Sequence, residues 1–109
     1  MNIDNLTLGQ IKQISNLFQT NTEHSFPVGH NVFIRCVTHY YTGKLVRVTS
    51  GELVLEDAAW IADTGRFSDA LYTGKLNEVE PFPSGEVFVN RGAVVDVSRW
   101  THSLPRTAK

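Results

Sequence analysis

The chain has 109 residues, of which 41% are hydrophobic and 19% charged, and this composition is typical of one folded domain. Ten basic and eleven acidic residues give a net charge of −1, which argues against a protein that binds long nucleic acids through a basic face. A small phosphorylated ligand is still compatible with this charge, because its phosphates need only a few well-placed cations.

Targeting signals are missing from the sequence. Residues 1–20 lack the apolar core of a signal peptide, and no run reaches the roughly 20 apolar residues of a membrane span. Cys36, the only cysteine, is expected to be a small buried hydrophobe in a reducing compartment. We therefore expect a cytoplasmic protein without membrane segments.

A helix is predicted at the start of the chain, over residues 8–19. Thr7 and Gln10 have the spacing of a capping box. The residues that follow place an apolar stripe at helical spacing, formed by Ile11, Ile14, Leu17 and Phe18. This stripe is expected either to cover a sheet or to pack against another copy of the chain.

Residues 31–57 predict three antiparallel strands, because apolar and polar residues alternate along them and Ser50-Gly51 forms a tight turn. A short helix is expected over residues 68–73, capped by Ser68 and Gly74. Further strands are expected over residues 78–82, 86–89 and 93–97, the last buried on both faces.

The predicted fold class is therefore α+β, in a single domain over residues 1–109. An N-terminal helix within residues 1–20 precedes a mostly antiparallel sheet of five to six strands, or a small barrel, over residues 31–99. Residues 100–109 form an irregular tail.

No pattern of catalytic or metal-ligating residues stands out. The four histidines are scattered, Cys36 has no cysteine partner at ligand spacing, and no glycine-rich phosphate loop or nucleophile elbow occurs. Acidic pairs such as Glu56-Asp57 are more often solvated than catalytic. We therefore expect a binding protein without cofactor or metal, rather than an enzyme.

The best candidate ligand contacts lie at breaks in regular structure. Phe82 stands between two prolines, so its ring is either a platform on which a base stacks or a plug at the end of the core. Asn90 and Arg91 offer an amide for a base edge and a fork for a phosphate, although they also suit an ordinary hairpin turn.

Three further arginines are candidates for an anion. Arg106 follows Pro105 in the tail and is either a ligand contact or simply solvated. Arg35 shares a strand face with apolar residues, so its charge must reach the rim or find an anion. Arg66 is either a ligand contact or the partner of Asp63 or Asp69. Together these residues suit an anionic, aromatic small molecule.

Four stretches resemble a known family. They are MNIDNLTLGQIK, VFIRCVTHYYTGKLVRVTSGELVLEDAAWIADTGRFSDAL, LNEVEPFPSGEVFVNRGAVVD and the closing LPR. Together they cover nearly the whole chain, which is similar to the first family of phage Thoeris anti-defence proteins, the signal sponges.

The resemblance implies a function. Such proteins bind cyclic ADP-ribose isomers made by bacterial TIR-domain immune proteins, and they sequester this signal without cleaving it. They assemble as dimers or hexamers, and some also hold cyclic trinucleotides at a separate site. The family's pocket uses an aromatic ring, an asparagine and arginines, and these roles match Phe82, Asn90 and Arg106 here, with Arg35, Arg66 and Arg91 as further candidates. The implied location is the cytoplasm of the infected bacterial host.

An alternative is an Sm-like or SH3-like small β domain that binds RNA or a protein. Residues 32–57 suit such a domain, since a strand, a bend at Thr42-Gly43 and an apolar strand ending in Glu56-Asp57 follow one another. The acidic balance and the long segment after Trp60 argue against it. An enzyme that hydrolyses the nucleotide is a third option, for which the sequence offers no metal or nucleophile.

Overall fold

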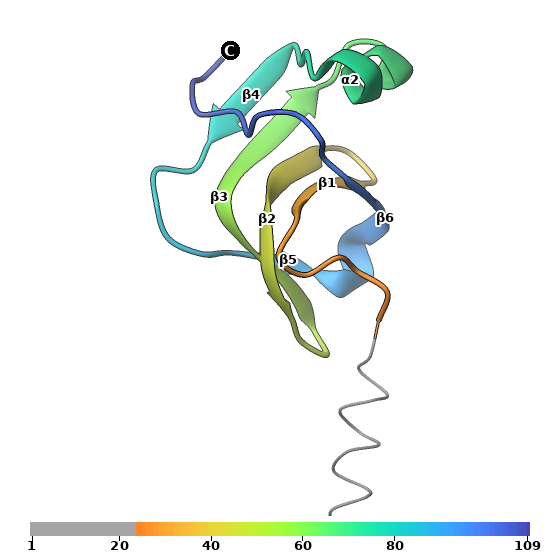
Figure 1. The fold of residues 1–109 in the computed structure, drawn as a ribbon, viewed down its shortest axis with the longest axis vertical. Coiled ribbons are helices and arrows are strands. Elements are labelled where there is room, and N and C mark those ends of the chain that lie inside the picture. Colours follow the sequence, from red (N-terminus) through yellow and green to blue (C-terminus); the bar gives the residue numbers. More distant parts are fainter. Residues whose placement is uncertain (1–23) are drawn as a thin grey trace, which may run out of the picture.

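The computed structural model describes residues 24–109 (Figure 1). In this part of the chain the elements are β1 (Asn31–Cys36), β2 (Tyr40–Val48), β3 (Glu52–Asp63), α2 (Phe67–Thr73), β4 (Glu78–Pro81), β5 (Val87–Asn90), the 3₁₀ turn η1 (Arg91–Ala93) and β6 (Val94–Arg99). No helix among them combines the length and apolar character needed to cross a membrane.

The predicted α+β fold class with a helix ahead of the sheet is wrong. Residues 24–109 form a mostly antiparallel sheet of six strands, and their α-helix is the seven-residue α2, which lies between the third and fourth strands. Among the described residues, α2 and the C-terminal segment (residues 100–109) cover one face of the sheet, where they pack on the second core described below. The helix predicted over residues 8–19 lies outside the described residues.

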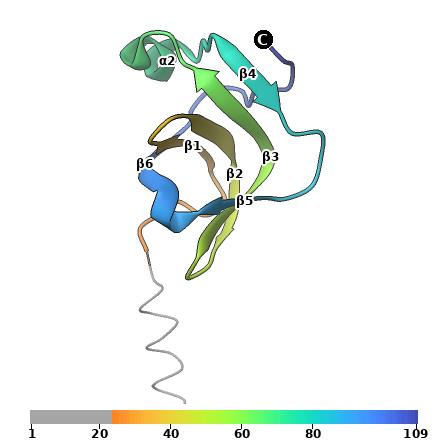
Figure 2. The same cartoon turned by 180° about the vertical axis from the view of Figure 1, so that it is seen from behind.

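Within residues 24–109, the strands form a curled sheet that is not closed by hydrogen bonds between its ends. The ladder runs β4-β3-β2-β1-β6, and β5 also pairs with β3. Since η1 joins β5 directly to β6, the strands β5, β3, β2, β1 and β6 enclose a common interior (Figure 2). The positions of β1, β2 and β3 agree with the strands expected from residues 31–57.

The sheet has a core on each face. Inside the curl lie buried side chains from β1, β2, β3 and β5, including Val32, Ile34, Leu45, Leu53, Leu55 and Val89. On the other face, α2 and the C-terminal segment cover a second cluster formed by Phe33, Ala59, Ile61, Ala70, Leu76, Val79 and Trp100. Because β1 supplies both clusters, its residues Val32, Phe33 and Ile34 are all almost fully buried.

Two local predictions need correction. The strand expected over residues 93–97 was predicted to be buried on both faces, yet β6 pairs through β1 at the end of the ladder and Val95 is 55% exposed. The helix α2 begins at Phe67, one residue earlier than predicted, so Ser68 lies inside the first turn and is not its N-cap. Gly74 does end this helix, in the left-handed conformation with φ 76°.

The strand β3 bends at Asp57, whose φ is 50°. Lys44 pairs with Glu56 and Thr42 with Ala59, so one residue of β2 faces two of β3, and this is the pattern of a β-bulge. The residue left at the bend is Gly43. A Cβ atom there would lie 3.2 Å from the Cα of Ala58 and from the carbonyl oxygen of Glu56. A side chain at residue 43 would therefore crowd β3 at the bend, and glycine avoids this contact.

The C-terminal segment is ordered by its contacts although it has no regular structure. Trp100 donates from Nε1 to the carbonyl of Ser103, and a ring nitrogen of His102 lies 2.7 Å from the carbonyl oxygen of Leu71 in α2. At the end of the chain, Lys109 and Val79 exchange backbone hydrogen bonds along the outer edge of β4. This path carries residues 105–106 across the edge of β3.

We predict that Gly43→Ala destabilises the fold by about 1–3 kcal/mol, because backbone atoms of β3 cannot move aside as a flexible side chain would. Gly51→Ala is the matched control, since nothing lies within 4 Å of a Cβ atom at that turn, and its effect should stay within about 0.5 kcal/mol. Urea unfolding of both variants measures the difference. Equal stability of the two variants would contradict the role given to Gly43.

Candidate functional site

A hollow of about 260 Å³ lies at the edge of β3. On this edge β5 pairs with residues 52–55 and β4 with residues 59–63, so the middle of β3 at Asp57 and Ala58 has no strand beside it. The loop from β4 to β5 swings out past this gap and returns at the far end of β3 (Figure 1). Asp57 and Ala58, residues 81–85 of the loop, and residues 105–106 of the C-terminal segment line the hollow.

The ring of Phe82 forms one wall and is held in place from behind. Its backbone N–H donates to the carbonyl of Ala58 at 2.9 Å, and Pro81 and Pro83 restrict the backbone on both sides. The ring of Tyr41 stacks on Phe82 with centroids 6.5 Å apart and planes inclined by 22°. Phe82 is nevertheless 38% exposed. A flat aromatic surface of fixed orientation is therefore presented to the hollow.

Tyr41 is itself fixed. His39 Nε2 lies 3.2 Å from the phenolic oxygen, and the His39 ring packs edge-on against the Tyr41 ring at 5.1 Å. Burial, and secondarily the nearby Cys36 thiol, raise the pKa of Tyr41 above its ordinary value, so the phenol stays a neutral hydroxyl at physiological pH.

Arg106 supplies the positive charge. Its Nη1 donates to Oδ1 of Asp57 at 3.2 Å, and the two side chains are 67% and 52% exposed. One such bond uses a single N–H of the five that a guanidinium offers. The remaining N–H groups can donate to a ligand, because the side chain is exposed. The guanidinium fork matches the oxygen atoms of a phosphate.

The loop that carries Phe82 is fixed at its other end as well. Arg47 of β2 holds Glu86 through two hydrogen bonds, of 2.6 and 3.1 Å. Between Phe82 and Glu86, a shallower hollow of about 230 Å³ continues the first one along β3 and is lined by Glu56, Asp57 and residues 83–86. The site is thus a short groove with one aromatic wall, one cation and several carboxylates.

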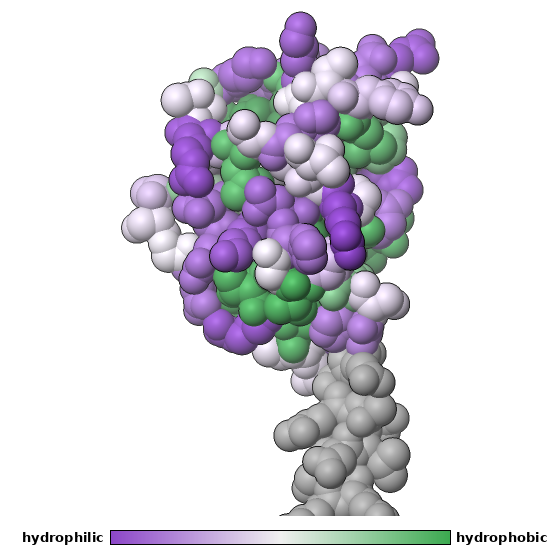
Figure 3. Space-filling model, in the orientation of Figure 1, coloured by the Kyte–Doolittle hydropathy of each residue, from purple (hydrophilic) through white to green (hydrophobic). Residues whose placement is uncertain are grey.

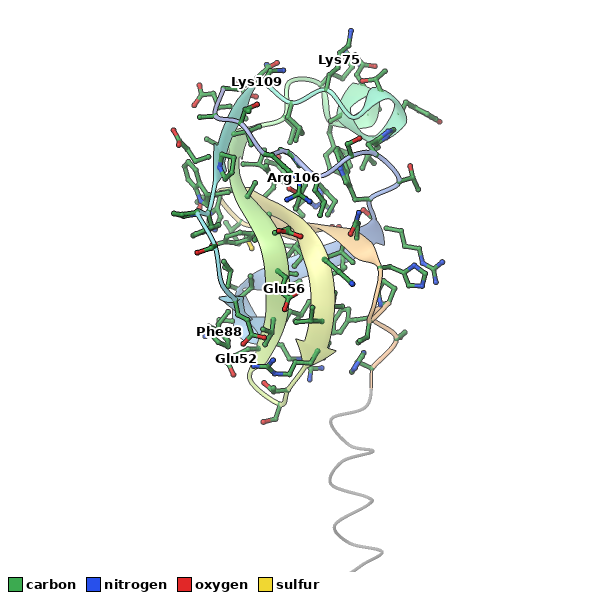
Figure 4. All side chains as sticks on the ribbon, turned by 60° about the vertical axis from the view of Figure 1, so that its left-hand side comes forward. Glu52, Glu56, Lys75, Phe88, Arg106 and Lys109 are labelled. Atoms are coloured by element: carbon green, nitrogen blue, oxygen red, sulfur yellow. The ribbon has the colours of Figure 1, made fainter. Side chains whose placement is uncertain are left out.

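Of the predicted site residues, the structure brings Phe82 and Arg106 together. Asn90 and Arg91 lie at the other end of β3, where Asn90 pairs with Glu52. Ala58 is six residue steps from Glu52, or about 20 Å along the strand. Figure 4 shows Glu52 and Phe88 together at the lower end of the molecule, away from Arg106. Within one chain, Asn90 and Arg91 are therefore not part of this groove.

Asn90 and Arg91 also have structural roles. The Asn90 side chain caps η1 by accepting from the backbone N–H of Gly92 at 2.8 Å. Arg91 donates to the carbonyl of Thr49 at 2.9 Å, and its guanidinium lies over the Phe26 ring at 5.6 Å from the centroid. These contacts hold the turn that joins β5 to β6. Whether either residue also contacts a ligand stays a prediction.

Arg35 and Arg66 lie elsewhere. Arg35 forms an ion pair with Asp96 on the neighbouring strand β6 and stands over the Phe67 ring at 5.4 Å. This partner raises the pKa of the Arg35 guanidinium. Asp96 is thus an anion of the protein itself that pairs with the charge of Arg35. Arg66 is exposed immediately before α2, and within residues 24–109 it forms no ion pair with Asp63 or Asp69.

From the sequence, Asp57 is expected only as half of a solvated acidic pair and is not placed in the binding site. The available signal was a break in alternation, because Leu53 and Leu55 predict an apolar residue at position 57 and the sequence has an aspartate there. Aspartate tolerates the left-handed region better than most residues. A polar residue out of phase, with Gly43 on the preceding strand, indicates a bulge that turns a side chain toward a new direction.

No protein-family model matches the chain, and no curated protein or solved structure is detectably similar to it. Within residues 24–109, no group of three or more histidine, cysteine or acidic side chains is placed to hold a metal ion. The visible face in Figure 3 is mostly hydrophilic, with an apolar patch at its lower end and smaller apolar areas in its upper part.

We predict that acid releases the loop from β2. The bond from Arg47 lowers the pKa of the Glu86 carboxyl. The stabilisation by this pair is therefore present above the carboxyl's unfolded pKa and is lost as pH falls through the lowered folded pKa. In an NMR pH titration the Ser84 and Gly85 amide signals should shift in that window, and in Glu86→Gln they should not. Identical titrations of the two proteins would contradict this anchoring.

Proposed function

We propose that the protein binds a small phosphorylated aromatic molecule, of the class of the cyclic ADP-ribose isomers, and sequesters it without cleaving it. The observation that carries this proposal is the convergence of Phe82 and Arg106, which lie far apart in the sequence, on one hollow. A base stacked on the ring and a phosphate on the guanidinium match the two parts of a nucleotide. The same two residues fill these roles in the family resemblance described above.

Sequestration, rather than turnover, suits the chemistry of these side chains. Phe82 and Arg106 bind without supplying a nucleophile or a proton acceptor. The carboxylate beside them, Asp57, is exposed and already accepts a hydrogen bond from Arg106. In the proposed role the protein holds the signal made by TIR-domain proteins and so blocks Thoeris defence in the cytoplasm of an infected bacterium.

The size of the hollow favours assembly of several copies. Its volume of about 260 Å³ is below the roughly 300–1,000 Å³ of pockets that enclose a drug-sized ligand. A stacked base at about 1–3 kcal/mol and one charge-assisted hydrogen bond at about 1.5–3 kcal/mol fall well short of the −12 kcal/mol of a nanomolar complex. We therefore propose a homo-oligomer, a dimer or a hexamer, in which a second copy covers the ligand.

This assembly also gives Asn90 and Arg91 a place in the proposal. They lie at the far end of β3 from the hollow of their own chain. They would contact a ligand held by Phe82 and Arg106 only from another copy. Any contribution of Arg35 or Arg66 needs the same arrangement, because both lie outside the residues that line the groove.

The second candidate function is a small β domain that binds RNA or a protein. It is supported by the curled sheet, in which η1 joins β5 to β6, and by a row of aromatic side chains beside the hollow. His39 packs on Tyr41 and Trp60, and Tyr41 packs on Phe82. The carboxylates of Glu56, Asp57 and Glu86 along the groove oppose a phosphate backbone, which makes RNA the less favourable occupant.

One experiment separates these functions. The protein is incubated with a cyclic ADP-ribose isomer, freed of unbound ligand, heat-denatured, and the released material is analysed by mass spectrometry. We predict intact nucleotide. A linear product would identify an enzyme, and no retention would favour the RNA- or protein-binding alternative.

Variants of the groove should lose retention without unfolding. Arg106→Ala and Phe82→Leu each remove one ligand contact, and both side chains are substantially exposed. We therefore expect retention to fall at least tenfold, the equivalent of about 1.4 kcal/mol, with the melting temperature nearly unchanged. Arg99→Ala and Phe88→Leu are matched controls, since both residues are exposed and lie outside the groove. If the groove variants unfold, or the controls lose retention equally, the assignment of this site is wrong.

A further inference from the structure

A carboxylate lies where the proposed site meets its phosphate-binding arginine. Asp57 lines both the main hollow and its shallower continuation. Its backbone is left-handed, with φ 50°, at the bulge that bends β3. Non-glycine residues adopt this conformation at some cost, and bulges next to binding sites commonly re-aim a side chain. The bend thus directs a negative charge into a site proposed to bind an anion.

The contacts of Asp57 leave part of its carboxylate unused. Oδ1 accepts from Nη1 of Arg106 at 3.2 Å, and no residue of the described chain donates to Oδ2. The side chain is 52% exposed. An ionised carboxylate is purely an acceptor, so what it can take from a ligand is a donated hydrogen, such as that of a hydroxyl group. It repels the phosphate that Arg106 attracts.

We propose that Asp57 is a specificity residue that accepts a hydrogen bond from a sugar hydroxyl, so that the groove selects ribonucleotides over phosphates that carry no sugar hydroxyl. This inference rests on the proposed function of the same groove. The Phe82 ring, the Asp57 carboxylate and the Arg106 guanidinium line the same hollow, and the carboxylate contacts the guanidinium, so the base, ribose and phosphate of a nucleotide each have a matching group there. A carboxylate that binds ribose hydroxyls has a precedent in dinucleotide-binding folds, where an acidic residue holds the 2′-hydroxyl.

The ion pair strengthens this selection. A ligand with only a phosphate must share Arg106 with Asp57 and gains nothing from the carboxylate. A ribonucleotide brings a hydroxyl and a phosphate a few bonds apart, so it can bond both members of the pair at once. The groove thus recognises a phosphate and a hydroxyl group together, whereas a lone surface arginine would recognise only the phosphate.

The test uses three probes, namely ADP, 2′,3′-dideoxy-ADP, which lacks only the sugar hydroxyls, and inorganic pyrophosphate, which lacks the whole nucleoside. Dissociation constants are measured by NMR titration of the full-length protein. We expect ADP to bind about tenfold tighter than the dideoxy nucleotide, as a charge-assisted hydrogen bond predicts. Pyrophosphate should bind weakest of the three.

Two substitutions isolate the carboxylate while keeping the bend. Asp57→Asn is isosteric and Asp57→Gly removes the side chain, and both residues adopt positive φ readily. Discrimination between ADP and dideoxy-ADP should shrink to about threefold or less in Asp57→Asn, a neutral acceptor, and vanish in Asp57→Gly. Pyrophosphate should bind several-fold tighter to both, because its competitor for Arg106 is gone. Melting temperatures confirm that both variants fold.

The substitutions should reduce the preference for ADP and strengthen the binding of pyrophosphate, and these opposite changes make the proposal falsifiable. If the substitutions weaken pyrophosphate as well as ADP, Asp57 merely positions Arg106 and the inference is wrong. Equal binding of ADP and dideoxy-ADP to the unmodified protein, or no binding of ADP, would overturn it too. Retention of the cyclic ligand is a separate measurement, so the proposed function can stand while the role of Asp57 fails. Loss of that retention would instead reject the proposed function itself.

Discussion

The bend of β3 at Asp57 is the constraint on which the rest of the structure depends. One edge of this strand pairs with β2 along its length, while the other edge pairs first with β5 and then with β4. In a strand without a bulge, the odd-numbered residues from 53 to 61 would all lie on the same face of the sheet. With the bulge, Leu53 and Leu55 belong to the inner core, whereas Ala59 and Ile61 belong to the core under α2.

The bend also explains why the groove lies where it does. Where β3 changes partners, neither β4 nor β5 covers its edge, and its backbone groups need other partners. The N–H of Phe82 supplies one by bonding to the Ala58 carbonyl. The loop is thereby fixed over the gap and the C-terminal segment passes beside it. A stable core and an open groove thus follow from the same bulge, and the groove's own side chains remain largely exposed.

Sequence patterns located the strands because alternation and turn residues are local signals. Val32, Ile34 and Cys36 do share the inner core, as their period of two requires. The fold class was wrong because the cover of a sheet depends on tertiary contacts. Trp100 and α2 lie on the outer face of the sheet, and nothing in their own sequence says which face they pack on. The tail was expected to be irregular and is, yet Trp100 is 3% exposed.

The candidate site was predictable in part for a similar reason. Phe82 and Arg106 are predicted from their side-chain chemistry and from the prolines next to them in the sequence. The fold places both of them at one hollow. The same reasoning from side-chain chemistry also predicts Asn90, Arg91, Arg35 and Arg66, which lie outside the groove. The chemistry of a side chain does not say how far apart two residues lie in the folded protein. Arg35 shows the difficulty, since its partner Asp96 is 61 residues away in the chain and adjacent only after β1 and β6 have paired.

The energetics of the Arg106–Asp57 pair are compatible with a binding role. An exposed ion pair contributes about 0–1 kcal/mol to stability, whereas a charge-assisted hydrogen bond to a ligand contributes about 1.5–3 kcal/mol. The guanidinium therefore loses little when it exchanges part of its contact with Asp57 for a phosphate. Were the same pair buried, breaking it would leave an uncompensated charge and cost about 3–5 kcal/mol. The exposure of this pair, at 67% and 52%, is thus what keeps Arg106 both oriented and available.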